Sequence, residues 1–128
     1  MRFIPTRVHG VLDYASSLLL IAAPYLFGFA NGGPAQWVPM MLGAGYVIVS
    51  LITDYELSLV RLVPMPVHLA IDAAGGLFLA ASPWIFGFAD QVFWPHLLLG
   101  LFAVGAALTS RTGPDTAATQ AARSYGSQ

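Results

Sequence analysis

The chain has 128 residues, of which 57% are hydrophobic and only 9% are charged, whereas soluble domains carry about 25% charged residues. A surface this poor in charge indicates contact with lipid, and a net charge of −1 gives no electrostatic basis for binding nucleic acid. The absence of cysteine excludes disulfides, thiolate metal sites and cysteine nucleophiles.

The first half of the chain predicts two membrane-crossing helices, over residues 8–29 and 37–53. At 1.5 Å per residue the first of them is roughly 33 Å long, which is enough to cross the hydrocarbon core. Pro24 lies in its last third, where the missing backbone donor predicts a kink, and Gly28 then favours termination. An uncharged turn over residues 31–36 joins the two helices.

The second half predicts two more helices, over residues 67–88 and 93–110, with a kink at Pro83. A linker over residues 57–66 precedes them. Residues 111–128 are small, polar and aperiodic, so they are predicted to form a disordered cytoplasmic tail.

An internal duplication relates the two halves. Residues 2–30 and 61–89 align without a gap at an offset of 59 and are identical at 14 of 29 positions, which is the signature of a repeat. The second helix of each half aligns at an offset of 57. Because the first apolar run has a copy in the middle of the chain, we expect it to be a permanent helix and not a cleaved signal peptide.

The predicted fold is therefore an all-α membrane domain over residues 1–110, with four transmembrane helices arranged as two tandem two-helix repeats. The repeats cover about residues 2–54 and 61–110. Each repeat crosses the membrane twice, so the duplication is parallel and its pseudo-twofold axis is expected to follow the membrane normal.

All five arginines fall on one side of the predicted bundle. The positive-inside rule then places both termini in the cytoplasm. Three of these arginines lie close to the repeated helix starts and are candidates to hold an anionic lipid head group, with ordinary membrane anchoring as the alternative. They are Arg2, Arg7 and Arg61.

A proline-aromatic-aliphatic-Phe-Gly-Phe motif ends the first helix of each half. Its residues are Ala23, Pro24, Tyr25, Phe27 and Gly28 in the first copy and Ser82, Pro83, Trp84, Phe86 and Gly87 in the second. We interpret it as a packing motif with interfacial aromatic residues, and a hinge or a quinone-like aromatic slot is the alternative. In the second copy the proline frees the carbonyl of Leu79, and Ser82 can bond to backbone nearby.

The motif, the helix count and the duplication resemble those of the SPW repeat family. Those proteins are small bacterial membrane proteins whose repeat holds two transmembrane helices, with the Ser-Pro-Trp motif in the first. The resemblance covers nearly all of residues 2–110, although the first copy reads Ala-Pro-Tyr. It implies the architecture and a location in the bacterial cytoplasmic membrane, and it brings no established activity.

Each half also carries a histidine and an aspartate four residues apart, which places both side chains on one helical face. The pairs are His9 with Asp13 and His68 with Asp72. If the pseudo-twofold brings them together, they are candidates to bind a divalent metal such as zinc, iron or manganese, to relay protons, or to ligate haem. The alternative is a structural role in which each aspartate accepts a hydrogen bond from its own histidine. An aspartate about two turns inside a span is costly, which favours a defined role.

No nucleophile-base set, phosphate loop or dinucleotide fingerprint is visible. We therefore predict a non-enzymatic module of the lipid bilayer that self-associates or joins a larger membrane complex. The alternative is a small metal- or proton-handling transporter or redox subunit that uses the His/Asp layer near the cytoplasmic face. No cofactor is predicted, with a divalent metal or haem as alternatives, and His96 is expected to be exposed.

Overall fold

The computed structural model describes residues 2–53 and 57–112. These residues form four α-helices and no strand, as the sequence predicts: α1 (Thr6–Leu26), α2 (Pro34–Leu51), α3 (Met65–Ile85) and α4 (Trp94–Thr109). The predicted disordered tail falls, from residue 113 onward, outside the described residues.

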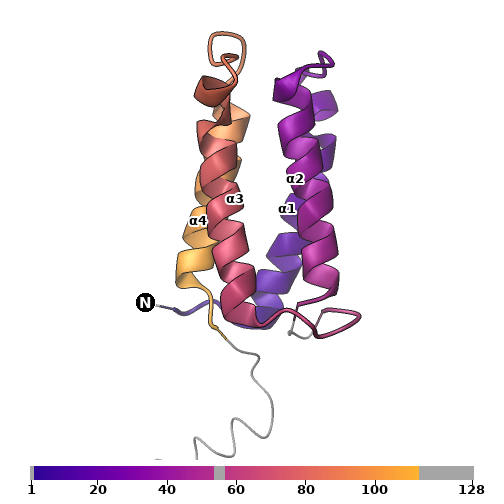
Figure 1. The fold of residues 1–128 in the computed structure, drawn as a ribbon, viewed down its shortest axis with the longest axis vertical. Helices are drawn as coiled ribbons and strands as arrows, with labels where there is room; N and C mark the ends of the chain where they lie inside the picture. Colours follow the sequence, from indigo (N-terminus) through magenta and orange to yellow (C-terminus); the bar gives the residue numbers. More distant parts are fainter. Residues whose placement is uncertain (1, 54–56, 113–128) are drawn as a thin grey trace, which may run out of the picture.

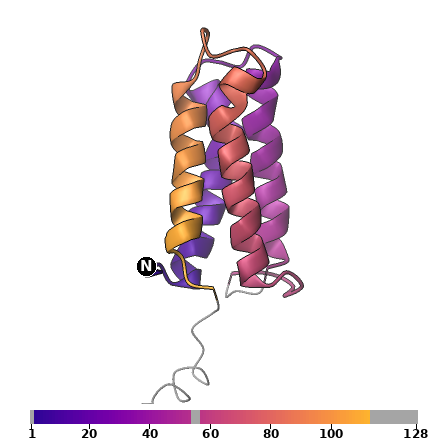
Figure 2. The same cartoon turned by 60° about the vertical axis from the view of Figure 1, so that its left-hand side comes forward.

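The helices form two hairpins, α1 with α2 and α3 with α4, that stand side by side (Figures 1 and 2). The short turn inside each hairpin lies at one end of the bundle, and the N-terminus and the α2–α3 connection lie at the other (Figure 1). Packing is much more extensive within each hairpin than between the hairpins.

Close helix contact within each hairpin depends on glycine. A Cβ atom added to Gly43 of α2 would lie 2.7 Å from the backbone oxygen of Ser17 in α1. A Cβ atom added to Gly76 of α3 would lie 2.7 Å from the backbone oxygen of Gly100 in α4. Only residues without a Cβ allow the backbones to approach this closely, as is common between membrane helices.

Helices α1 and α3 begin two residues earlier and end three residues earlier than predicted. Each ends two residues after its proline, Pro24 or Pro83, so the proline lies in the last turn instead of inside a longer helix. Glycine decides the end: Gly28 and Gly87 adopt φ angles of +76° and +74°, which stop the helix in the left-handed region.

The duplicated motif separates into buried and exposed parts. Pro24 and Pro83 are buried, whereas Tyr25 and Trp84 are exposed. The Ser82 hydroxyl donates a 2.7 Å hydrogen bond to the Leu79 carbonyl, the group that Pro83 leaves without its helical partner.

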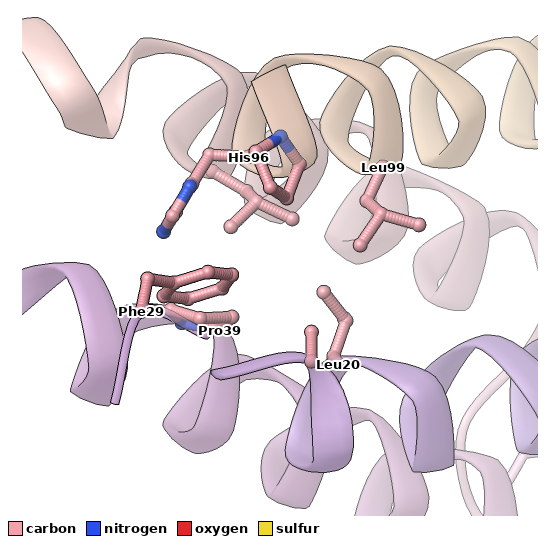
Figure 3. A pocket seen from close by; sticks show the side chains of 8 residues that line it. Leu20, Phe29, Pro39, His96 and Leu99 are labelled. Carbon is pink, nitrogen blue, oxygen red and sulfur yellow. The ribbon is translucent and has the colours of Figure 1, made fainter. Parts of the chain in front are cut away.

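His96 is buried, with 1% of its surface exposed, so the prediction that it is exposed is wrong. Its Nε2 donates to the Ala35 carbonyl at 2.8 Å, and its ring packs between Phe29 and Phe88, with centroid distances of 5.1 and 4.9 Å. Figure 3 shows His96 facing Phe29 across the space between the hairpins. That space is too narrow to hold a water molecule.

The outer surface is apolar. Helices α2 and α3 are long and apolar enough to cross a membrane, and α4 is an apolar helix of 16 residues. Large exposed hydrophobic side chains occur on every helix, for example Leu18, Met41, Leu77 and Leu101. A continuous apolar surface of this kind belongs in lipid, so the chain is a membrane protein.

The close contact at Gly100 between α3 and α4 leads to a testable prediction. Replacing Gly100 with alanine places a methyl group against the backbone of Gly76 and Ala80, and overpacking of this kind costs about 1–3 kcal/mol. The matched control is Gly105→Ala on the same helix, where nothing lies within 4 Å of the added Cβ. Thermal unfolding in detergent should show a lower midpoint for the first variant only, and equal midpoints would contradict the packing argument.

Candidate functional site

The two His-Asp pairs predicted from the sequence meet at one place in the bundle. We call them the His/Asp quartet: His9, Asp13, His68 and Asp72. One nitrogen or oxygen atom from each side chain lies within 4.8 Å of the other three. Helix α1 supplies the first pair and helix α3 the second, so the quartet joins the two hairpins.

Each imidazole lies between the two carboxylates. His9 Nε2 is 2.8 Å from Asp72 Oδ2 and 3.0 Å from Asp13 Oδ1. His68 Nε2 is 2.8 Å from Asp13 Oδ2 and 3.1 Å from Asp72 Oδ2. For both histidines the shorter contact is to the aspartate of the other hairpin, so the quartet is more than two separate pairs within their own helices.

Two hydroxyl groups that the sequence analysis missed hold the other side of the imidazoles. His9 Nδ1 is 2.6 Å from Ser110 Oγ, and His68 Nδ1 is 2.6 Å from Thr53 Oγ1. Thr53 and Ser110 correspond at the offset of 57 that relates the second helices of the repeats. The sequence does hold a signal for these two residues, namely a hydroxyl side chain at equivalent positions after the second helix of each repeat.

The hydrogen bonds of the two hydroxyl groups determine which nitrogen of each imidazole carries a hydrogen. Thr53 Oγ1 donates its one hydrogen to the Val49 carbonyl, and Ser110 Oγ donates its own to the Ala106 carbonyl, both at 2.6 Å. Each hydroxyl oxygen can then only accept from the imidazole. Nδ1 of both histidines therefore carries a hydrogen, and Nε2 is the nitrogen that faces the carboxylates.

The chain entering each repeat positions these hydroxyls. The Arg111 amide donates to the Ile4 carbonyl at 2.8 Å, and the Ile4 amide donates to the Thr109 carbonyl at 2.9 Å, which fixes the residues on either side of Ser110. In the other repeat the Val63 amide donates to the Ile52 carbonyl at 2.7 Å, directly before Thr53. The ends of α4 and α2 are thus tied to the strand-like segments that lead into α1 and α3.

The arginines predicted to bind lipid head groups are placed differently from one another. Arg2 donates to the carbonyls of Ala107 and Ser110, at 2.9 and 2.8 Å, where it caps the C-terminus of α4. Arg7 and Arg61 are exposed at the same end of the bundle. Lipid binding by these three residues stays a prediction.

The quartet is almost closed to the surroundings. The side chains of His9 and His68 are 1% and 0% exposed, and those of Asp72 and Asp13 are 7% and 11% exposed. Beside three of the four lies a cavity of about 20 Å³, which is space for about one water molecule. A haem group or a larger substrate does not fit there.

The duplicated motif lies at the other ends of α1 and α3, so it does not share a site with the quartet. About 15 residues of helix separate the two layers, which is roughly 22 Å. Buried residues of the motif layer, Ala23, Phe29, Ala35 and Phe88, form an apolar cluster of their own.

The contact between hairpins predicts strong coupling between His9 and Asp72. Asp72→Leu leaves the imidazoles short of a carboxylate in a buried place, so we expect a loss of about 3–5 kcal/mol. The double variant His9→Leu/Asp72→Leu should lose less than the sum of the single variants, with a coupling energy of about 1–3 kcal/mol. Unfolding in detergent and SDS mixtures measures all three, with exposed Asp90→Leu as control. Additive losses would show that the two residues act independently.

The chain also matches a known protein family. The SPW repeat domain matches residues 7–110, a range that includes the quartet, both of its hydroxyl partners and both copies of the motif. No curated protein and no solved structure matches the chain. Because the match covers most of the chain, including nearly all of the helical bundle, this protein belongs to the SPW repeat family.

Proposed function

We propose that the protein is a non-enzymatic membrane module in which the His/Asp quartet holds two helical hairpins together. The proposal rests on the contacts that the ring nitrogens of the quartet make. Both nitrogens of His9 and His68 contact groups of the protein itself, and the adjoining cavity of about 20 Å³ leaves no room for a substrate. A transporter is less well supported, because the same groups are buried and the described cavity beside them has a volume of about 20 Å³.

We further propose that all four helices cross the membrane. Asp13 makes crossing by α1 costly, as Asp72 does for α3, and the quartet places Asp13 at 3.0 and 2.8 Å from two imidazoles. Helix α1 has 21 residues, the same length as α3, which is long and apolar enough to cross. The 16 residues of α4 are roughly 24 Å long, so this helix needs its flanking residues or a thinner local bilayer.

The proposed orientation places both termini in the cytoplasm of a bacterium. Arg2, Arg7 and Arg61 lie at the end that holds the N-terminus, and Asp90 lies in the turn at the other end. This distribution supports a positive-inside arrangement in the cytoplasmic membrane.

A topology experiment tests the spans and the orientation together. Reporter domains fused after residue 112 and inserted at residues 31–33 should report the cytoplasm and the opposite side, respectively. The protein should also stay with membranes in alkaline carbonate. Reporters on the same side would mean an even number of spans between the two sites, against the three that we propose. A third reporter in the α3–α4 turn then distinguishes three spans from one. Release by carbonate, or a cytoplasmic reporter in either hairpin turn, would contradict the proposal.

Association with a second copy or with another membrane protein is the remaining part of the proposal. Two apolar grooves run between the hairpins, about 310 Å³ between α1 and α4 and about 320 Å³ between α2 and α3. They correspond in the two repeats, since Ala15 in the first matches Ala74 in the second. Grooves of this size at the lipid-facing surface suit a helix of a neighbouring protein.

Single cysteines test this association, because the chain has none of its own. Ala15→Cys or Ala74→Cys should form crosslinked dimers, or crosslinks to a partner, in native membranes. Leu18→Cys, on the exposed surface of α1, is the matched control. Crosslinking at the control position alone, or at none of them, would contradict association through the grooves.

A further inference from the structure

We infer that the His/Asp quartet binds one divalent transition-metal ion of the zinc class, and that this ion joins the two hairpins. The inference rests on the proposed structural role of the quartet and gives that role a specific ligand. It concerns a closed structural site, in contrast to a transport path or a redox centre.

The donor set and its spacing carry the inference. Two imidazole nitrogens and two carboxylate oxygens are ligands that zinc, iron and manganese accept. In a tetrahedral site with bonds of about 2.0–2.2 Å, the ligand atoms lie about 3.3–3.6 Å apart. In the quartet the neighbouring atoms are 2.8–3.1 Å apart and the whole set lies within 4.8 Å. Side-chain shifts of about half an ångström therefore convert one arrangement into the other.

The second, independent observation is the way in which the rings are held. Ser110 and Thr53 accept hydrogen bonds from Nδ1 of His9 and His68, at 2.6 Å each, so both rings point Nε2 toward the centre of the quartet. Histidines that bind metals usually donate their other N–H to a fixed acceptor in this manner. Without the ion, Nε2 of each ring must carry a hydrogen to donate to the carboxylates, so the ion would replace one proton on each ring.

Charge balance also favours an ion of charge +2. A divalent ion with two neutral imidazoles and two carboxylates has no net charge. A neutral set suits groups that are 0–11% exposed in a membrane helix bundle, where unbalanced charge is costly. A monovalent ion would leave one carboxylate uncompensated.

The space beside the quartet indicates a structural ion. The four protein ligands complete a tetrahedral site, and structural zinc sites are closed in this way. The cavity of about 20 Å³ next to His9, Asp13 and Asp72 admits about one water molecule and nothing larger.

The test uses the full-length protein, purified in detergent with a tag that contains no histidine. Elemental analysis should find about one zinc ion, or a similar divalent ion, per chain. Removal of the metal with a chelator should lower the thermal midpoint, and added Zn²⁺ should restore it. Co²⁺ added to the stripped protein should produce the visible absorption of a tetrahedral site, saturating at one equivalent.

Three variants identify the ligands. His9→Ala/His68→Ala should lose the metal and the Co²⁺ absorption. His96→Ala removes a buried histidine outside the quartet and should keep both. Thr53→Val/Ser110→Ala keeps all four ligands but removes the acceptors of Nδ1, and its metal affinity should fall about 10–100-fold.

The inference is overturned if wild-type protein contains no stoichiometric metal and shows neither Co²⁺ absorption nor a change in midpoint with Zn²⁺. Equal Co²⁺ binding by the double histidine variant would overturn it as well. If that variant does not fold, the Co²⁺ titration of the wild-type chain decides. Coupling between His9 and Asp72 without bound metal would leave the proposed structural role intact and remove only the metal.

Discussion

The arrangement of the two hairpins depends on the need to compensate four buried ionisable groups. Asp13 and Asp72 each lie inside a largely apolar helix, where an uncompensated carboxylate is expensive. The histidine on the same helix reaches its aspartate at 3.0 or 3.1 Å, but the 2.8 Å contacts are those made across the hairpins. The quartet side chains of α1 and α3 must therefore meet across the bundle, although these two helices do not pack directly on each other. Contact between the hairpins is sparser than contact within them. The quartet therefore contributes to their register together with the apolar clusters around Phe29 and Phe88 and around Leu20 and Leu79.

The quartet in turn depends on how the chain enters and leaves its helices. Thr53 and Ser110 follow the last turns of α2 and α4, where each hydroxyl donates to a carbonyl four residues earlier. The segments that lead into α3 and α1 pair with the same two residues, Val63 with Thr53 and Ile4 with Ser110. Each hydroxyl is fixed by its own helix and by the incoming chain, so the imidazole that it holds cannot rotate freely. Short polar contacts at the ends of α2 and α4 thus determine the direction of side chains in the early turns of α1 and α3.

The sequence predicted those parts of the fold and of the candidate site that are encoded by a repeated pattern. The spacing of His9 and Asp13, copied at an offset of 59, was enough to make a meeting of the two pairs one of two alternatives, beside separate pairs on their own helices. Thr53 and Ser110 were missed because a single hydroxyl after an apolar run is usually a helix-end residue. The burial of His96 could not be predicted, since it has no copy and depends on how the first turn of α4 meets Phe29 and Phe88. The helix ends were misplaced because Gly28 and Gly87 act earlier than the apolar pattern suggests.

The two halves differ beside the quartet but not within it. Tyr46 of α2 fills the space on one side, and Gly75 makes room for its hydroxyl, because a Cβ there would overlap it. The corresponding residues on the other side, Ala103 and Ser16, line the cavity of about 20 Å³. A change at such a flanking position alters only the volume beside the quartet. A change within the quartet removes a partner from groups of both hairpins, so each repeat constrains the other there.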